Sequence, residues 1–451
     1  MGSLDQIFKA YDVRGTVPDQ WDAHDAYAIG AAFARFAQDR EGATRVLVAR
    51  DMRPSGVELT KAFTEGVIDQ GLDVVDLGLT STDLIYFASG TLDAPGAVFT
   101  ASHNPAQYNG IKFCLAGAKP VGEDSGLAEI KALAASGVEK TGRRVGRVSA
   151  TQLLDAYAEH VVSFVDHTAL RPLRVVADTA NGMGGLVAPE VFAKLPFDLE
   201  VMYGELDGTF PNHPADPIQP ENLRDLQARV LDTGADIGLA FDGDADRVFL
   251  VDEKASAISG STTTSMVAKA MLEKHPGATI LHNLICSKTV AEVVRENGGT
   301  PIRTRVGHSF IKERMAATDA VFGGEHSGHY YFRDNFRADS GLIAAVVVLE
   351  LLSKADRPLS EVRAPFERWV ASGEINTEVD DQRTVTERVA GRYADAEQDR
   401  LDGLTVDVGD WWFNLRPSNT EPLLRLNLEA RTADECSARV AEVLELIRGG
   451  D

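Results

Sequence analysis

A serine hydroxyl stands in a loop of the kind that carries chemistry in α/β proteins. Thr100-Ala-Ser-His-Asn-Pro105 follows the apolar run 97–99 and precedes Tyr108-Asn-Gly-Ile-Lys112. Because ligands of α/β sheets gather at the carboxyl ends of strands, Ser102 is a candidate nucleophile or phosphate carrier. His103 lies beside it, and Lys112 could reach the same place as a cation or a general base. Considered alone, however, the segment favours a plain turn, for which serine, asparagine and proline are common residues.

A second loop places three carboxylates at alternate positions. Asp242-Gly-Asp-Ala-Asp-Arg247 follows the apolar run 237–241. In an extended segment alternate side chains project to one side, so Asp242, Asp244 and Asp246 would form a compact set of oxygen ligands suited to Mg²⁺. Like charges this close repel one another unless a cation lies among them, which favours a metal site over a solvated acidic turn. An EF-hand is excluded, because Arg247 stands where that loop needs glycine and residues 248–251 have the pattern of a strand.

The third loop, Phe322-Gly-Gly-Glu-His-Ser-Gly-His-Tyr330, combines glycines with a carboxylate, a hydroxyl and two imidazoles. Sugar hydroxyls need such a mixture of donors and acceptors, so Glu325, Ser327 and His329 are candidate sugar ligands. A glycine-rich connection is the plain alternative. Zinc on His326 and His329 is disfavoured, because no further ligand lies close to them in the sequence.

The fourth loop, Arg416-Pro-Ser-Asn-Thr-Glu-Pro422, offers a guanidinium, two hydroxyls and an amide. These groups, with the backbone N–H groups of a turn, suit a phosphate. The candidate phosphate ligands are Arg416, Ser418, Asn419, Thr420 and, a little further on, Arg425. A polar hairpin is an equally good interpretation of this segment when it is considered alone.

These loops must be held by several folded units, because 451 residues exceed one ordinary core. Short apolar runs that end in polar loops and alternate with helix-like stretches predict α/β units in tandem. From Glu374 onward, four apparent strands precede one last helix, Thr432 to Ile447, which predicts a small α+β domain. The expected domains are residues 1–146, 147–252, 253–365 and 366–451.

Composition narrows the class of ligand. Acidic residues exceed basic ones by 68 − 45 = 23, so the overall field repels nucleic acids, and a small phosphate ester would need a few arginines and lysines gathered in one place. The longest apolar run, 342–352, is too short to cross a bilayer. The first residues lack the features of a secretory signal, and three widely spaced cysteines suggest reduced thiols. We therefore expect a cytoplasmic protein with no membrane or nucleic-acid partner.

Together the four loops resemble those of the α-D-phosphohexomutase family, in the family's order and over nearly the whole chain. That family has a T-x-S-H-N-P phosphoserine loop, a D-G-D-x-D-R metal loop, a G-E-x-S-G sugar loop and an R-x-S-N-T-E-P phosphate loop. Lys9-Ala-Tyr-Asp-Val-Arg-Gly15 is also similar to a family segment, which implies that Tyr11 and Arg14 face the active site. Val306-Gly-His308 resembles a segment that contributes an active-site histidine.

The resemblance implies an α/β fold with four domains around a central cleft: three tandem related α/β units with mixed sheets and a smaller C-terminal α+β domain. It implies a mutase that interconverts hexose 6-phosphate and hexose 1-phosphate through phosphorylated Ser102. Mg²⁺ would be held by the three aspartates and Ser102, Arg247 would bind substrate, and a hexose 1,6-bisphosphate would act as the activator. Ser102, His103, Lys112, Arg14 and His308 would form the catalytic group. The partners are small hexose phosphates, and the enzyme would be a monomer or a homodimer.

Two details bear on the sugar. Some bacterial phosphomannomutase/phosphoglucomutases carry a lysine near the position of Ile285, whereas Lys288 is offset from it. The sugar loop is closer to that of phosphomannomutases than to that of phosphoglucosamine mutases, which favours mannose phosphate with glucose phosphate as a second substrate. The alternatives are a phosphoglucomutase or phosphoglucosamine mutase, an aspartyl phosphotransferase that uses Asp242, and a non-catalytic phosphosugar-binding protein.

Overall fold

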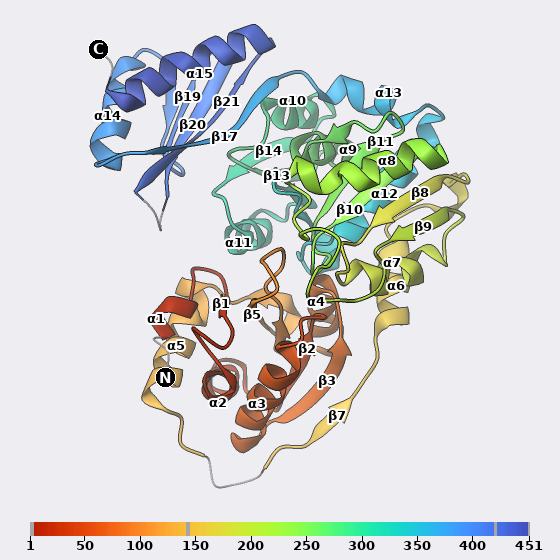
Figure 1. Ribbon diagram of the computed structural model, residues 1–451, viewed down its shortest axis with the longest axis vertical. Helices are drawn as coiled ribbons and strands as arrows, with labels where there is room; N and C mark the ends of the chain where they lie inside the picture. The colour runs from red at the N-terminus through yellow and green to blue at the C-terminus, as the bar shows by residue number, and fades with distance from the viewer. Residues whose placement is uncertain (1–3, 141–144, 419–421, 450–451) are drawn as a thin grey trace.

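The chain forms four lobes, each built on its own β-sheet (Figure 1). The structure, a computed structural model, describes residues 4–140, 145–418 and 422–449. No helix within these ranges is long and apolar enough to cross a membrane. Three α/β lobes precede a smaller α+β lobe, which confirms the predicted fold class. The lobes are called domains I to IV below, and the expected boundaries after residues 146, 252 and 365 stay predictions.

Domain I is built on a mixed sheet in the order β1-β5-β4-β2-β3-β7, with β6 beside β5. Alternate residues of the central strand β2 point to opposite faces: Val46 and Val48 pack against α2, α3 and α5, and Leu47 and Ala49 pack against α4. Both faces are therefore buried, as parallel α/β sheets require. The strands are β1 (Val13–Thr16), β2 (Arg45–Arg50), β3 (Asp73–Leu79), β4 (Gly96–Phe99), β5 (Tyr108–Leu115), β6 (Lys119–Pro120) and β7 (Val148–Ala150). The helices are α1 (Leu4–Ile7), α2 (Ala23–Glu41), α3 (Gly56–Asp69), α4 (Thr82–Leu92) and α5 (Ala128–Ser136).

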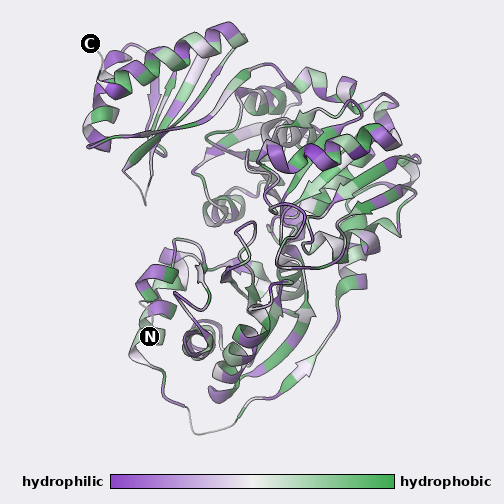
Figure 2. Ribbon diagram, viewed as in Figure 1, coloured by the Kyte–Doolittle hydropathy of each residue, from purple (hydrophilic) through white to green (hydrophobic). Residues whose placement is uncertain are grey.

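Domain II has a five-stranded sheet in the order β12-β11-β10-β8-β9. The helix α8 packs on one face through Leu226 and Val230 and turns its polar side outward, as Figure 2 shows by its colour. The strands are β8 (Arg174–Asp178), β9 (Asp198–Met202), β10 (Ile237–Phe241), β11 (Val248–Asp252) and β12 (Ala257–Ile258). The helices are α6 (Leu154–Val162), α7 (Gly184–Phe192) and α8 (Arg224–Thr233).

Domain III has a four-stranded sheet in the order β14-β13-β15-β16. The longest apolar run of the sequence lies in α12, which is buried in a core shared with domain II. Its buried Glu350 accepts hydrogen bonds from Lys274 and Lys354, so the run is a core helix. The strands are β13 (Thr279–Asn283), β14 (Thr300–Thr304), β15 (Phe322–Gly324) and β16 (Tyr330–Phe332). The helices are α9 (Gly260–Lys274), α10 (Lys288–Glu296), α11 (His308–Thr318), α12 (Gly341–Ala355) and α13 (Leu359–Arg363).

Domain IV is an antiparallel sheet in the order β17-β21-β20-β19-β18, packed against α14 and α15. The strand β18 and the helix α14 were not among the elements expected from the sequence. The strands are β17 (Val370–Glu378), β18 (Glu397–Asp399), β19 (Leu404–Asp407), β20 (Trp411–Pro417) and β21 (Leu423–Ala430). The helices are α14 (Gln382–Arg392) and α15 (Ala433–Arg448).

Every domain contains an antiparallel strand pair that encloses one of the four loops. The pair β4 and β5 encloses residues 100–107, β10 and β11 enclose 242–247, and β15 and β16 enclose 325–329. In domain IV, β20 and β21 pair across the segment that begins at Ser418. In domains I to III, the first strand of the pair is also hydrogen-bonded to a parallel neighbour. The loop therefore lies at the carboxyl edge of a parallel set.

A buried carboxylate lies where domains I, II and III meet. Asp83 of α4 accepts hydrogen bonds from Ser81, from Tyr157 of α6 and, at 2.6 Å, from Ser340 at the N-cap of α12. Burial raises the pKa of Asp83 to about 7, although the three hydroxyl groups oppose this shift. The side chain therefore holds a proton more strongly in the folded chain than in the unfolded one.

We predict that Asp83 makes the fold less stable as the pH rises. A carboxyl group whose pKa rises from 3.8 to about 7 on folding favours the folded state fully below the unfolded pKa. This contribution is lost as the pH rises toward the folded pKa, by up to about 1.4 kcal/mol per pH unit. Melting temperatures at about pH 5 and pH 7.5 should therefore differ less for Asp83→Asn than for the wild type. Asp39→Asn on α2 changes an exposed aspartate and should keep the wild-type difference; equal pH dependence of all three proteins would contradict the prediction.

Candidate active site

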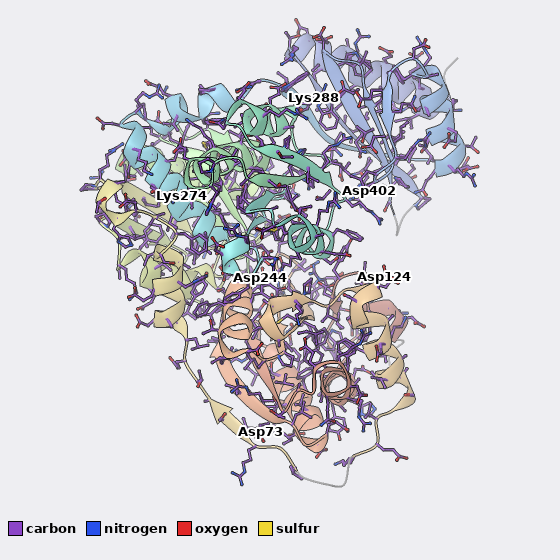
Figure 3. The ribbon with its side chains drawn as sticks, turned by 180° about the vertical axis from the view of Figure 1, so that it is seen from behind. Asp73, Asp124, Asp244, Lys274, Lys288 and Asp402 are labelled. Atoms are coloured by element: carbon purple, nitrogen blue, oxygen red, sulfur yellow. The ribbon has the colours of Figure 1, made fainter. Side chains whose placement is uncertain are left out.

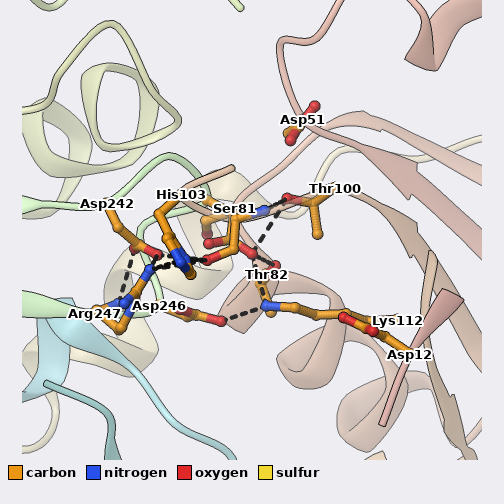
Figure 4. Close-up of polar contacts among 12 residues, drawn as sticks. Asp12, Asp51, Ser81, Thr82, Thr100, His103, Lys112, Asp242, Asp246 and Arg247 are labelled. Carbon is orange, nitrogen blue, oxygen red and sulfur yellow. Dashed lines mark hydrogen bonds and ion pairs between the residues drawn. The ribbon is translucent and has the colours of Figure 1, made fainter. Parts of the chain in front are cut away.

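The loop between β4 and β5 holds the hydroxyl of Ser102 against domain II. Oγ of Ser102 donates a 2.8 Å hydrogen bond to Oδ2 of Asp242 and accepts one of 3.1 Å from the guanidinium of Arg247. Figure 4 labels these two partners. Only 5% of Ser102 is exposed. Its φ of +50° lies in the left-handed region, which L residues rarely adopt. The structure thus brings the serine loop and the acidic loop together across two domains.

His103 lies beside the serine as a neutral imidazole. Burial, reinforced by the positive charges of Arg247 and Arg14, lowers the pKa of His103 to about 2. Its Nδ1 is 2.5 Å from the Arg247 guanidinium and 3.3 Å from Oγ of Ser102. Because a guanidinium can only donate, Nδ1 is the acceptor, and His103 holds the guanidinium next to the serine oxygen.

The three aspartates form the cluster that the sequence predicts. One carboxylate oxygen of each of Asp242, Asp244 and Asp246 lies within 4.8 Å of the other two, and all three residues are buried. Oδ1 of Asp244 and Oδ1 of Asp246 accept no hydrogen bond from any residue that the structure describes. Buried carboxylate oxygens without a partner are costly, and oxygens at this spacing suit a hard divalent cation. The residues present therefore fit Mg²⁺.

Two side chains of domain I also bind this cluster. Nζ of Lys112 lies 2.7 Å from Oδ2 of both Asp244 and Asp246, and the hydroxyl of Thr82 donates a 2.6 Å hydrogen bond to Asp244. Burial favours the neutral form of each group, but the opposite charges outweigh it: they raise the pKa of Lys112 well above its ordinary value and lower the pKa of Asp244. Lys112 is therefore a buried cation that links domains I and II. Figure 3 shows Asp244 at this junction.

The loop between β15 and β16 lies directly against the acidic loop. An isolated backbone bridge pairs Arg247 with His329, and Nε2 of His329 lies 3.6 Å from Oδ1 of Asp246. Oγ of Ser327 is 3.1 Å from Nδ1 of the same imidazole. Asp246, His329 and Asp339 form a second group with ligand atoms within 4.8 Å of one another. The third loop thus joins the first two.

Glu325 is the most firmly held side chain of this loop. It is buried and accepts hydrogen bonds from the hydroxyl of Tyr331, at 2.6 Å, and from the amide of Asn283, at 3.2 Å. A carboxylate has about four acceptor sites, so further donors can still bind to it. Its fixed position suits the recognition of a particular hydroxyl group.

In domain IV, two arginines stand directly opposite each other on β20 and β21. Arg416 pairs in register with Arg425, and their guanidinium groups lie 3.8 and 3.4 Å from Glu374. Like charges across a strand pair repel each other, and Nε of each is buried without a hydrogen-bond partner in the described part of the chain. Such a pair fits an anion such as phosphate. Ser418 is the last residue described before Asn419 and Thr420, which lie outside the described residues.

The amino-terminal segment lies among the loops. The hydroxyl of Tyr11 donates a 3.3 Å hydrogen bond to the backbone oxygen of Val306 in domain III. Burial raises the pKa of Tyr11, and the charges of Glu325 and Arg416 also act on its phenol. Tyr11 is therefore within electrostatic reach of both the sugar loop and the tail loop.

The structure places the side chain of one of two other predicted catalytic residues, Arg14, but not that of the second, His308. The guanidinium of Arg14 donates a 2.8 Å hydrogen bond to Oδ1 of Asn104, so it lies on the serine loop. His308 is the first residue of α11, beside the segment that Tyr11 contacts. The side chain of His308 lies outside the described part of the chain.

The offset lysine of domain III lies on domain IV. Nζ of Lys288 is 2.5 Å from Oδ1 of Asp407 and 5.1 Å from the ring centre of Trp369, and Figure 3 labels it beside that domain. Ile285 is buried. Lys288 therefore serves the contact between domains III and IV in this structure.

Several side chains of the site were not found by sequence reasoning. They are Thr82, Arg53, Asn283 and Tyr331, which bind the acidic cluster, the serine loop or Glu325. One signal was available, because Arg50-Asp-Met-Arg53 directly follows the apolar run 46–49, and such runs were expected to end in polar loops. Thr82 begins α4, Asn283 ends β13 and Tyr331 lies within β16, and the neighbours of all three are set by the tertiary fold.

Comparison with known proteins shows which family this chain resembles. Four models of one family match in order: phosphoglucomutase/phosphomannomutase alpha/beta/alpha domains I, II and III at residues 5–141, 155–256 and 259–369, and the C-terminal domain at 374–446. A phosphohexose mutase of Xanthomonas campestris is 41% identical over 98% of this chain and 99% of its own length. A phosphomannomutase of Salmonella montevideo is 40% identical over 98% of both chains.

A solved structure extends the similarity to three dimensions. The phosphoglucomutase/phosphomannomutase family protein of Burkholderia thailandensis is 32% identical, with a TM-score of 0.91, and covers 100% of this chain and 99% of its own. The chain belongs to the phosphoglucomutase/phosphomannomutase family. It is accordingly an enzyme, a phosphomannomutase-like intramolecular phosphotransferase of the isomerase class.

We predict that Asp244→Asn weakens divalent-cation binding at least about tenfold, because it removes one anionic oxygen from a hard-metal site. Titration calorimetry with Mn²⁺ or Mg²⁺ on the full-length protein measures the change. Asp232→Asn, an exposed change on α8 of the same domain, is the matched control and should bind like the wild type. Equal affinities in all three proteins would show that the acidic cluster binds no metal.

Proposed function

We propose that this enzyme interconverts hexose 6-phosphate and hexose 1-phosphate, with mannose phosphate preferred, through phosphorylated Ser102 and a hexose 1,6-bisphosphate. The observation that carries the proposal is the hydroxyl of Ser102 between Asp242 and Arg247. An oxygen nucleophile that lies against the carboxylates of a metal-binding loop and next to a guanidinium is well placed to carry a phosphoryl group. Relatives about 40% identical that are named phosphomannomutase support the choice of sugar.

One reaction comprises two phosphoryl transfers, each of a different phosphoryl group. In the first transfer, the bond between phosphorus and Oγ of Ser102 breaks and a bond to the free hydroxyl of the hexose monophosphate forms. The proton of that hydroxyl passes to a base of the site, and Oγ becomes a hydroxyl again when it takes up a proton. The bisphosphate then turns around, and the reverse transfer of its other phosphate restores phosphorylated Ser102. A free hexose 1,6-bisphosphate would phosphorylate unmodified enzyme by the same transfer.

The residues around Ser102 supply charge and orientation. When Mg²⁺ is held by Ser102 and the three aspartates, it supplies positive charge that stabilises the transferring phosphoryl group. The guanidinium of Arg247 would bind phosphate oxygens on Ser102 while neutral His103 keeps it in place. Lys112 stays a cation and balances the aspartates, so we assign it charge compensation in preference to the role of a base. Arg14 and His308 remain candidates for proton transfer and charge compensation.

The third loop would recognise the sugar. Glu325, held by two hydrogen bonds, would accept from sugar hydroxyls, with Ser327 and His329 beside it. A site that hydrogen-bonds a hydroxyl discriminates against sugars that lack it or place it differently. This loop is therefore the place where mannose, glucose and glucosamine phosphates would be distinguished.

We predict that Ser102→Ala lowers turnover of mannose 1-phosphate by about a thousandfold or more, because it removes the atom that carries the phosphoryl group. Turnover is measured with Mg²⁺ and a trace of hexose 1,6-bisphosphate. Incubation with bisphosphate labelled in its phosphates should label the wild type but leave this variant unlabelled. Ser136→Ala, at an exposed serine of α5, should retain both properties.

The nature of the label separates this function from its rival. Phosphoserine withstands hydroxylamine, whereas an acyl phosphate on Asp242 would be cleaved by it. Loss of the wild-type label in hydroxylamine would favour the aspartyl phosphotransferase. Normal turnover by Ser102→Ala would reject the phosphoserine.

We predict that Arg416→Ala raises the KM for both the 1-phosphate and the 6-phosphate by about thirtyfold, which corresponds to roughly 2 kcal/mol. Arg416 and Arg425 would hold whichever phosphate is not reacting, so both directions of the reaction should suffer. More bisphosphate should also escape during a single turnover, while phosphorylation of Ser102 should survive.

Arg400→Ala is the control, because it removes a guanidinium that is paired with Glu387 on the surface of the same domain. It should leave both KM values near those of the wild type. Unchanged KM values and no extra bisphosphate release in Arg416→Ala would show that the tail arginines do not bind the phosphate.

A further inference from the structure

Four backbone oxygens of the serine loop converge on one buried side chain. Arg53 follows β2 and is fully buried. Its Nη2 donates hydrogen bonds to the backbone oxygens of Ser102 (2.9 Å) and Asn104 (2.6 Å), and its Nη1 donates to those of Pro105 (2.8 Å) and Tyr108 (3.0 Å). One guanidinium thus binds the loop from its nucleophile to the start of β5.

The remaining donor of this guanidinium ties it to the sheet. Nε of Arg53 lies 3.2 Å from Oδ2 of the fully buried Asp51, so all five N–H donors are used. The N–H of Asp51 in turn donates a 2.8 Å hydrogen bond to the backbone oxygen of Phe99, the last residue of β4. Arg53 is therefore tied through Asp51 to β2 and β4, the two parallel strands that lead into the site. Figure 4 shows Asp51 beside Thr100.

The loop needs such a partner for two physical reasons. The left-handed backbone of Ser102 costs about 1 kcal/mol or more, so other interactions must hold it. Carbonyl oxygens that point to one place repel one another unless a cation lies among them, and only the planar fork of arginine presents five donors to a ring of acceptors. A Cβ added at Gly243 would lie 2.5 Å from the backbone oxygen of Ser102, so the acidic loop also packs closely against the serine loop.

Domain II completes the enclosure. The ring centre of Phe210 lies 5.1 Å from Cζ of Arg53. A Cβ added at Gly208 would lie 2.6 Å from Cα of Arg53, so the two backbones are in close contact. The guanidinium is thereby sealed from water, and its hydrogen bonds are stronger than they would be on the surface.

We propose that Arg53 is a positioning residue for the phosphoryl transfer: it holds the backbone of the serine loop so that Oγ of Ser102 lies between Asp242 and Arg247. This inference rests on the proposed role of Ser102. The guanidinium binds backbone oxygens, not the Ser102 hydroxyl, and acts only through the loop. A displacement of the nucleophile of about 1 Å can lower a rate about a hundredfold, whereas substrate affinity depends on other loops. Loss of Arg53 therefore lowers kcat and leaves KM for hexose phosphate nearly unchanged.

The test is Arg53→Lys in the full-length enzyme, with Arg363→Lys as the matched control. Lysine keeps the positive charge beside Asp51 but cannot reach four carbonyl oxygens at once. Arg363 is likewise paired with a fully buried aspartate, Asp252, at 2.9 Å, but it lies outside the site. We expect Arg53→Lys to lower kcat and the rate of Ser102 labelling by bisphosphate about a hundredfold, with KM within about threefold of the wild type. Arg363→Lys should change none of these.

Thermal melts separate positioning from a general loss of structure. The proposal would be overturned if the kcat of Arg53→Lys were within about threefold of that of Arg363→Lys. It would also be overturned if the kcat of Arg53→Lys fell only in proportion to the fraction of this variant that is folded. If Arg53→Lys does not fold, the double variant R53Q/D51N removes both buried charges. It should show the same loss of labelling with unchanged KM, and wild-type labelling by it would equally overturn the proposal. Wild-type enzyme is assayed in parallel, because failure of the wild type to label Ser102 would reject the proposed function instead.

Discussion

Three buried carboxylates within 4.8 Å of one another are the constraint on which the rest of the site depends. Their mutual repulsion must be balanced, and part of the balance comes from domain I: Lys112 binds two of them and Thr82 binds one. Ser102 reaches the third. The charges that suit phosphoryl transfer therefore also fix domain I against domain II, so the position of the nucleophile and the packing of the domains have one physical cause.

The second constraint concerns the position of these loops in each sheet. In domains I to III, a strand of a parallel set turns back as an antiparallel neighbour, which leaves a short loop at the carboxyl edge of the sheet. Short connections of this kind are held at both ends by strand hydrogen bonds, so their side chains are placed precisely enough for chemistry. Because three domains contain a loop of this kind, one chain can place loops on several sides of a substrate. Domain IV uses an antiparallel pair as well, but in a wholly antiparallel sheet.

The sequence predicted these loops well because their information is local. Apolar runs mark buried strands, and the residues after them, such as Ser102 and Asp242, are the ones the strands deliver. The partners of those residues are set by tertiary contacts, and no spacing in the sequence reveals that Thr82 meets Asp244 or that Arg53 collects four carbonyl oxygens. Short polar elements were also missed, since β18 has only three residues, Glu397 to Asp399, and none of them is apolar. Lys288 shows the same limit, because nothing in the sequence around it reveals its contact with domain IV.

The two ends of the proposed substrate site differ in a way that suits a bisphosphate that must turn around. At the reacting end, Ser102 is 5% exposed and its hydroxyl is held by Asp242 and Arg247, which suits phosphoryl transfer because that reaction demands a fixed line of attack. At the other end, the side chains of Arg416 and Arg425 are 18% and 32% exposed, and their guanidinium groups contact Glu374 at 3.8 and 3.4 Å. Charge attraction falls slowly with distance, so loosely held arginines can accept a phosphate in either of two orientations. A single site that acts on both the 1- and the 6-position needs a fixed geometry where the phosphoryl group reacts. At its other end it needs a charge attraction that accepts more than one position of the phosphate.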